Sequence, residues 1–167
     1  MNNELTKKDI QEMLDEIEYR KVVVRKEALE DVKQARAHGD LSENFEYHAA
    51  KKVKNQNESR IRYLEKMIKT ARVYEDTSKD DEVGINKTVT LFIPAQNLKQ
   101  SYTIVSTIRG DSLHNFISVE SPLGKSLLGH KVGDTVNVVV NPNFAYDVNI
   151  LEIVSSDKAD EAKIRSF

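Results

Sequence analysis

Apolar residues recur at helical spacing over two long stretches near the N-terminus. Neither stretch, 6–37 or 50–71, contains a glycine or a proline. Steps of three and four residues place apolar side chains on one face of an α-helix. The stripe positions are Ile10, Met13, Leu14, Ile17, Val24, Ala28, Val32 and Ala35 in the first stretch, and Ala50, Val53, Asn57, Ile61, Leu64, Ile68 and Ala71 in the second.

A short connection around 38–40 joins the two helices, so we expect them to pack antiparallel. A helix of about 30 residues is about 45 Å long and needs a partner along its length. Residues 1–75 are therefore predicted to form an antiparallel coiled-coil hairpin. Lys21 interrupts the first stripe, where its long stem can follow the seam and carry the charge to solvent. Asn57 either lies in the seam and sets the register or is simply exposed.

The second half of the chain has a different pattern. The polar, acidic segment 76–82 lacks apolar periodicity and is typical of a linker. The β-branched, often alternating runs that follow predict a mainly antiparallel sheet in a small domain over 83–156. The runs are 87–93, 101–106, 116–120, 134–140 and 146–153.

One short helix is predicted between the third and fourth runs. Ser121 is a helix cap, Pro122 suits the first helical position, and Gly129 suits the residue just past the end. The fold class is thus α+β, a helical hairpin followed by a sheet domain with one short helix. The polar residues 157–167 are expected to form a flexible tail.

Composition narrows the function classes. The 167 residues include no cysteine, which removes disulfides and thiolate metal sites and fits a reducing cytosol. There is no signal-peptide core and no run of the about 20 apolar residues that span a bilayer, so we expect a cytoplasmic protein. A net charge of −2 argues against a dedicated duplex-DNA binder and leaves weak DNA binding at most.

The connection between the helices is dense in acids, amides and hydroxyls. Asp40, Ser42 and Glu43 are also residue types that begin a helix, as caps or as acids near its positive end. Spacing alone leaves the capping role and a functional role open. His38 and His48 are ten residues apart, which is not a recognisable metal-ligand spacing. We expect structural or hydrogen-bonding roles for both histidines.

Two longer runs carry a family resemblance. The run Ala37-His-Gly-Asp-Leu-Ser-Glu-Asn44, followed by Glu46-Tyr-His-Ala-Ala-Lys51, resembles the tip signature of the bacterial Gre-type transcript-cleavage factors. The run 118–136, which begins Ser-Val-Glu-Ser-Pro-Leu-Gly-Lys, resembles the second signature of that family. Together the resemblance covers nearly the whole chain, and it implies that the sheet domain is FKBP-like.

The resemblance implies a function at bacterial RNA polymerase. The hairpin is expected to enter the secondary channel and to stimulate cleavage of backtracked nascent RNA, while the sheet domain docks at the channel rim. In this account the protein is a monomeric cofactor of the polymerase's own nuclease activity and not an enzyme. An inhibitor that plugs the same channel without cleavage is the alternative. An autonomous isomerase or nuclease and a plain coiled-coil adaptor are weaker alternatives.

The same resemblance assigns roles at the tip. Two-metal hydrolysis of a phosphodiester uses two ions about 3.5–4 Å apart, and Mg²⁺ takes oxygen ligands. Asp40 is expected to hold the second Mg²⁺ jointly with the polymerase. Glu43 is expected to share that ion and orient the attacking water, with Ser42 and Asn44 in support. The free protein is not expected to bind Mg²⁺ tightly.

Two further features of the hairpin bear on RNA. Phe45 occupies a position where the family pattern favours alanine, and it is expected either to pack against the hairpin or to contact the channel or an extruded base by stacking. The basic residues of both helices form either a solvated face or a weak stripe that guides the nascent RNA 3′ segment. They are Arg20, Lys21, Arg25, Lys26, Lys51, Lys52, Lys54, Arg60 and Arg62.

Overall fold

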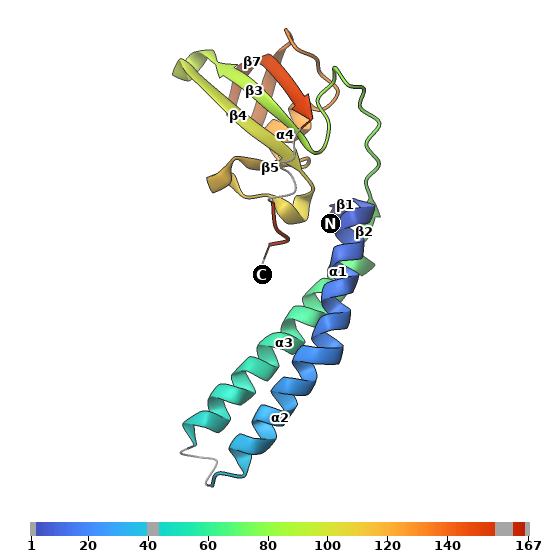
Figure 1. Cartoon of the computed structure of the whole chain (residues 1–167). Helices are drawn as coiled ribbons and strands as arrows, with labels where there is room; N and C mark the ends of the chain where they lie inside the picture. Colours follow the sequence, from blue (N-terminus) through green and yellow to red (C-terminus); the bar gives the residue numbers. More distant parts are fainter. Residues whose placement is uncertain (1–2, 40–43, 156–161, 166–167) are drawn as a thin grey trace. The chain divides into compact units, whose positions relative to one another are not determined.

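The computed structural model describes residues 3–39, 44–155 and 162–165 (Figure 1). These residues divide into two compact units. The hairpin unit lies within Lys7–Ala71, and the sheet unit comprises residues 3–6 and the described residues from Arg72 onward. The predicted α+β class is confirmed, and the boundary between the units falls before the segment that was predicted as a linker.

The hairpin unit has two long antiparallel arms (Figure 1). The first arm consists of α1 (Lys7–Tyr19), a π-helical segment η1 (Arg20–Val24) and α2 (Arg25–Arg36). The second arm is α3 (Phe45–Lys69), which packs along all three. The predicted hairpin is confirmed, apart from the π-helical segment.

The seam between the arms is narrow and mostly apolar. Its fully buried apolar side chains come from one face of each arm, as the stripes predicted. Leu14 and Val53 were predicted in these stripes but are 46% and 53% exposed, so they lie outside the seam. The buried apolar residues are Met13, Ile17, Ala28, Val32, Ala35, Ile61 and Leu64.

The π-helical segment has an identifiable cause. The Arg20 carbonyl accepts the Arg25 N–H, five residues on, and also the Asn57 side-chain amide at 3.3 Å. A side chain that inserts into the ladder of helical hydrogen bonds is a known origin of such distortions. Asn57 is 3% exposed, so its predicted place in the seam is confirmed. Lys21 is exposed and pairs with Glu65 of α3 at 2.7 Å, so its charge lies at the surface, as expected for a lysine that interrupts the stripe.

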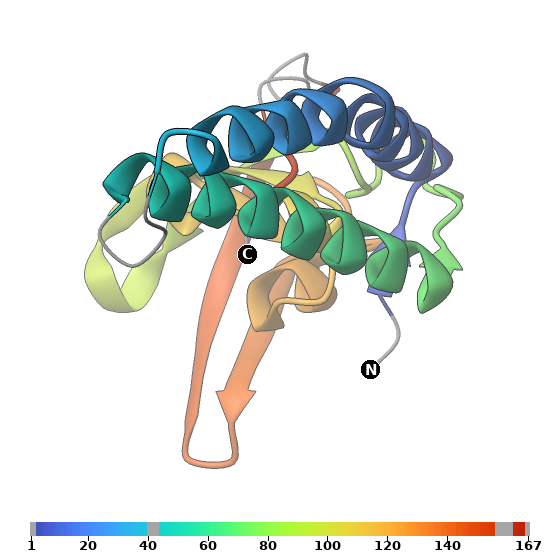
Figure 2. The ribbon, with the colours of Figure 1, turned by 90° about the horizontal axis from the view of Figure 1, so that it is seen from below.

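The sheet unit contains a five-stranded sheet in the order β5-β4-β3-β7-β6. The strands are β3 (Lys87–Ile93), β4 (Leu98–Val105), β5 (Phe116–Ser118), β6 (Thr135–Asn141) and β7 (Phe144–Ser155). Strands β6 and β7 extend as a long two-stranded ribbon (Figure 2).

The sheet is mainly antiparallel, as predicted, but it contains one parallel pair. Strand β5 runs parallel to β4, and the other pairs are antiparallel. Two 3₁₀ turns, η3 (Thr107–Arg109) and η4 (Ser112–His114), lie between β4 and β5 and bring the chain back in the same direction. A further 3₁₀ turn, η2 (Pro94–Gln96), joins β3 to β4.

The predicted short helix is confirmed as α4 (Pro122–Leu127). The Ser121 hydroxyl accepts the Gly124 N–H at 3.0 Å and caps its N-terminus. Gly129 follows the helix with a φ of 81°, a left-handed conformation that glycine adopts at little cost. The helix packs against β6.

The core of the sheet unit is a continuous apolar cluster. Alternate residues of β3 are buried, as period-two patterning predicts. Val83 and Ile85 precede that strand, Leu127 comes from α4, and the other strands supply most of the rest. The buried members are Val83, Ile85, Val89, Leu91, Ile93, Ile104, Val119, Leu127, Val136, Val138, Val148 and Ile150.

Two segments expected to be loose make specific contacts. The Lys87 ammonium, on a residue only 6% exposed, donates to the carbonyls of Lys79 at 2.6 Å and Glu82 at 2.8 Å, so the predicted linker 76–82 is held against β3. Part of the predicted tail is also held. Arg109 donates to the carbonyl of the buried residue Ala162 at 2.8 Å. A buried guanidinium needs an acceptor, and here it finds one in the segment that was expected to be free.

Two short strands were missed by the sequence analysis. β1 (Asn3–Leu5) and β2 (Ala71–Val73) form a two-stranded sheet. Three residues are too few for a period-two pattern to stand out from the helices that follow and precede them.

Candidate functional site at the hairpin tip

The tip residues with predicted chemical roles fall mostly outside the described part of the chain. Asp40, Ser42 and Glu43 lie in the undescribed segment 40–43, so their roles remain predictions. The residues on either side of that segment are described. They show how the two helix ends are held together.

Asn44 clamps the two arms at the tip. Its side-chain oxygen accepts the Tyr47 N–H at 3.0 Å, which makes Asn44 the cap of α3. Its amide nitrogen donates to the Ala35 carbonyl at 2.6 Å, near the end of α2. One side chain therefore satisfies a free donor of α3 and bonds to a carbonyl in the last turn of α2, which also accepts the His38 N–H at 3.2 Å. The N-cap of α3 is thus Asn44, which was expected only to support the carboxylates.

A second link between the helix ends involves Arg36 and Tyr47. The Arg36 guanidinium carbon lies 5.6 Å from the centre of the Tyr47 ring. Hydrogen bonding to Arg36 lowers the pKa of the Tyr47 hydroxyl. The cation of α2 thus lies beside the first turn of α3 and reinforces the contact made by Asn44.

The two histidines have different surroundings, and neither belongs to a metal site among the described residues. His38 lies 3.5 Å from the Glu46 carboxylate, and both side chains are exposed. The His48 ring packs edge-on against Tyr47, with 5.4 Å between ring centres. Within residues 3–39, 44–155 and 162–165, no group of three or more potential ligands is arranged to hold a metal ion. Gly39, in the turn after α2, has a φ of 130°, a conformation that glycine adopts at little cost.

Phe45 does not pack against the hairpin. As the first residue of α3, it is 87% exposed. Of the two expectations for this side chain, packing against the hairpin is wrong, and a contact with a partner stays a prediction.

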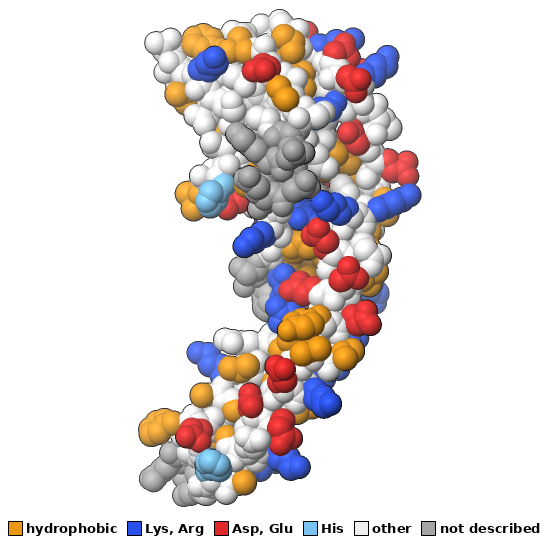
Figure 3. All heavy atoms as spheres, in the orientation of Figure 1, with side chains coloured by type: hydrophobic (Ala, Val, Ile, Leu, Met, Phe, Trp, Pro, Cys, Tyr) orange, Lys and Arg blue, Asp and Glu red, His pale blue; other side chains and the backbone are white. Residues whose placement is uncertain are grey.

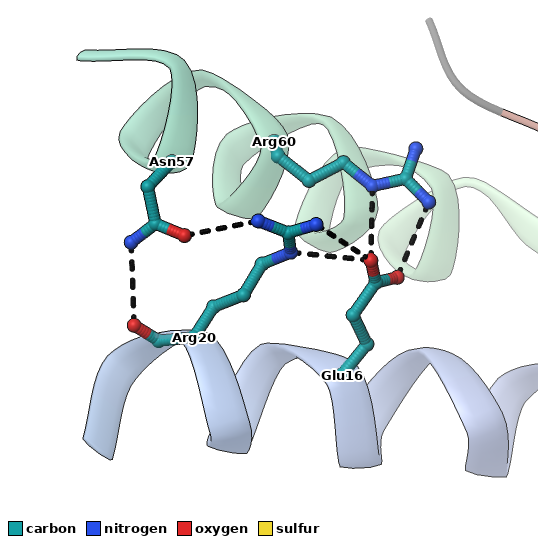
Figure 4. A network of polar contacts seen from close by, with 4 residues as sticks. All are labelled: Glu16, Arg20, Asn57 and Arg60. Atoms are coloured by element: carbon teal, nitrogen blue, oxygen red, sulfur yellow. Dashed lines mark hydrogen bonds and ion pairs between the residues drawn. The ribbon is translucent and has the colours of Figure 1, made fainter. Parts of the chain in front are cut away.

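A partly buried polar network fixes the register of the two arms (Figure 4). The Glu16 carboxylate accepts hydrogen bonds from the guanidinium groups of Arg20 at 3.1 Å and Arg60 at 3.2 Å. Arg20 also donates to the Asn57 side-chain oxygen at 3.0 Å. A buried polar residue in a helical seam specifies one register, because any slip separates the polar partners. The network therefore determines which residues of α2 and α3 face each other at the tip.

Comparison with known proteins decides the family. The family model "Transcription elongation factor, N-terminal" matches residues 3–73, and the model "Transcription elongation factor, GreA/GreB, C-term" matches residues 77–155. The chain belongs to the GreA/GreB family.

Individual GreA/GreB relatives match over most of their length. Transcription elongation factor GreA of Caldanaerobacter subterraneus subsp. tengcongensis is 47% identical over 150 residues, covering 89% of this chain and 95% of that protein. Transcription elongation factor GreA of Bacillus subtilis is 43% identical over 134 residues, covering 80% and 85%. Among solved structures, GreA factor homolog 1 (Gfh1) of Thermus thermophilus is 26% identical and covers 92% of this chain and 99% of that one, with a TM-score of 0.43.

The basic residues of this GreA/GreB hairpin fall into two groups. Arg20 and Arg60 are bound to Glu16 inside the seam, while Arg25 pairs with Glu58 at 2.7 Å. These three cations and Lys21 are therefore engaged within the hairpin, and the predicted stripe does not extend to them. Of the other stripe cations, Lys51, Lys52 and Arg62 on α3 and Lys26 on α2 are exposed, and Lys54 on α3 is half-buried.

Figure 3 shows acidic and basic side chains interspersed over the visible face of the hairpin. The first arm carries eight Lys and Arg and eight Asp and Glu over 7–36, whereas α3 carries seven and three. The basic excess of this GreA/GreB member is therefore confined to α3.

None of the helices in the described part of the chain has the length and apolarity that crossing a membrane requires.

Proposed function

We propose that this chain stimulates cleavage of backtracked nascent RNA by bacterial RNA polymerase, with its hairpin inserted in the secondary channel. The observation that carries the proposal is a clamped hairpin tip: Asn44 joins the ends of α2 and α3 at the point where the sequence places Asp40 and Glu43. Membership of the GreA/GreB family supports the same activity. The relatives named above are called transcription elongation factors.

The tip carboxylates supply the chemistry in this proposal. Asp40 and Glu43 would hold a Mg²⁺ ion together with the polymerase, since carboxylate oxygens are the ligands this ion prefers. When bound, a second Mg²⁺ stabilises charge on the attacking and leaving oxygens of the phosphodiester. Glu43 orients the attacking water, and Ser42 supports the carboxylates by hydrogen bonding. The chain itself is a cofactor, and the cleaving active site belongs to the polymerase.

The rest of the molecule presents the tip. The Glu16 network and the Asn44 clamp hold the arms in one register. The sheet unit docks at the rim of the channel, and the exposed cations of α3 contact the nascent RNA 3′ segment through its phosphates. The factor acts as a monomer in the cytoplasm.

A cleavage assay tests the proposal. Polymerase is backtracked on a defined template with RNA labelled at its 3′ end, and the factor is added with Mg²⁺. We expect release of short 3′ fragments. The Asp40→Asn, Glu43→Gln double variant should cleave about 10–100-fold more slowly or worse. Removing a residue that only supports a metal ligand already costs that much.

The matched control is the Glu30→Gln, Asp31→Asn double variant, which removes two acids from α2 away from the tip and should cleave normally. Nucleotide addition is measured in the same complexes, because a channel blocker slows addition without releasing fragments. Absence of fragments with the natural sequence, or full activity of the Asp40, Glu43 variant, overturns the proposal.

A further inference from the structure

Phe45 is a solvent-exposed aromatic residue that directly follows Asn44, the residue that joins the two arms. Its ring is 87% exposed, more than any other large apolar residue described in the hairpin. The preceding residue, Asn44, is bonded to both arms, so the backbone that carries Phe45 has a fixed place at the start of α3. A large exposed aromatic on a fixed backbone is ready to contact a partner without ordering cost.

A shallow groove on the outer face of α3 begins at His48, one helical turn after Phe45. The groove has a volume of about 450 Å³. Steps of three and four residues from Phe45 lead along one helix face to His48, Lys52 and Ser59. No acidic residue lines this groove, which is formed by His48, Lys51, Lys52, Asn55, Gln56 and Ser59.

None of the three glutamates of α3 lines this groove. At 100° per residue, each of its three glutamates points toward the side or front of the helix, where the first arm lies. Glu58 pairs with Arg25 and Glu65 pairs with Lys21, both on the first arm, and the Glu46 carboxylate lies 3.5 Å from the His38 ring. The cations of the groove are Lys51 and Lys52, and none of its other lining residues carries a negative charge.

We infer that Phe45 is a stacking platform for a base of single-stranded RNA whose phosphates follow the groove toward Lys52. Single-strand binding sites combine a cationic groove with an aromatic face on which a base stacks. Phe45 and Lys52 are seven residues apart, or about 10 Å along the helix axis, so one short RNA segment reaches both. An apolar patch of the channel wall would explain the aromatic ring but not the acid-free groove beside it.

The inference rests on the proposed function, because the RNA concerned is the extruded 3′ segment of a backtracked complex. The first test therefore does not depend on cleavage. A photoreactive thio-base at the RNA 3′ end is irradiated in the backtracked complex with the full-length factor, and the crosslinked peptide is identified by mass spectrometry. A crosslink at Phe45 is expected, and a crosslink confined to the polymerase overturns the inference.

Variants at one position separate stacking from apolar contact. Phe45→Ala should weaken the apparent affinity of the factor for backtracked complexes by about 5- to 150-fold, as expected for loss of one stacked base. Phe45→Tyr should retain affinity, whereas Phe45→Leu should behave like Phe45→Ala. Val53→Ala, which removes another exposed apolar side chain of α3, is the matched control and should have no effect.

The groove is tested by salt. Lys52→Gln should reduce the salt dependence of binding by about one phosphate contact, while Lys33→Gln on α2 should not. Full affinity of Phe45→Ala, or of Phe45→Leu, overturns the stacking role. If the natural factor releases no RNA fragments yet crosslinks through Phe45, the proposed function fails and the inference stands.

Discussion

The sheet unit and the hairpin unit are stabilised in different ways. The sheet unit encloses an apolar cluster drawn from the sheet, α4 and the segment before β3. The hairpin buries a thin apolar seam interrupted at its centre by Glu16, Arg20, Asn57 and Arg60. Apolar contacts are nondirectional, whereas hydrogen bonds specify partners. The hairpin is thus built for register, which suits an element that has to present a tip.

The largest expected effect comes from opening the apolar cluster. Leu91 is fully buried in β3, and Leu91→Ala should destabilise the sheet unit by about 2–5 kcal/mol. Hydrogen exchange of the full chain, followed by mass spectrometry, should show faster exchange across β3, β4 and β7. Hydrogen exchange within α3 should change little, because α3 belongs to the hairpin unit and packs against the first arm. Equal acceleration in α3 would show that the two units unfold together.

An intermediate effect is expected from breaking the polar network. Glu16→Gln removes the charge that two guanidinium groups share, one of them on Arg60, which is 9% exposed. The cost should be about 1–3 kcal/mol, measured by urea unfolding of the hairpin signal in circular dichroism. The control is Glu18→Gln, at an exposed position two residues further along α1. It should change the free energy of unfolding by no more than about 0.5 kcal/mol. Similar values for both variants would mean that the network does not hold the arms.

The smallest effect concerns the ion pair at the edge of the seam. The Arg25 guanidinium lowers the pKa of the Glu58 carboxylate through a hydrogen bond at 2.7 Å. A carboxylate whose pKa is lowered by folding stabilises the fold above its unfolded pKa, and this contribution is lost as the pH falls through the folded pKa. Glu58→Gln should therefore cost about 0.2–1 kcal/mol at neutral pH.

The stability difference between the natural chain and Glu58→Gln should disappear in acid. Thermal unfolding of the natural chain and of Glu58→Gln is compared from neutral pH to below the folded carboxylate pKa. A difference that is constant over the whole range would rule out the charged pair as its cause.

Sequence reasoning succeeded where local pattern controls structure. The hairpin, the strand β3 and the capped helix α4 follow from periodicity and end signals within a few residues. It failed where the cause lies far away along the chain. The π-helical segment depends on Asn57, which is 37 residues from Arg20, and the parallel pairing of β5 depends on two intervening 3₁₀ turns.

The candidate site shows the same division. The tip run and its acidic residues are evident in the sequence, but the clamp is not, because Asn44 bonds to Ala35 across the hairpin. The exposure of Phe45 also escaped prediction, since an aromatic near a helix start is as compatible with packing as with solvent. The stripe of basic residues was overestimated, because only the structure shows which cations face Glu16, Glu58 and Glu65.

The central proposal is that the tip carboxylates hold a second Mg²⁺ jointly with the polymerase, and a Mg²⁺ titration of RNA cleavage tests it most directly. Cleavage rates are measured in backtracked complexes with the natural factor, with Asp40→Asn and with the control Asp31→Asn. The account predicts that Asp40→Asn raises the Mg²⁺ concentration for half-maximal cleavage by about 10–100-fold, while Asp31→Asn leaves it unchanged. A slower rate with an unchanged Mg²⁺ midpoint would contradict the claim.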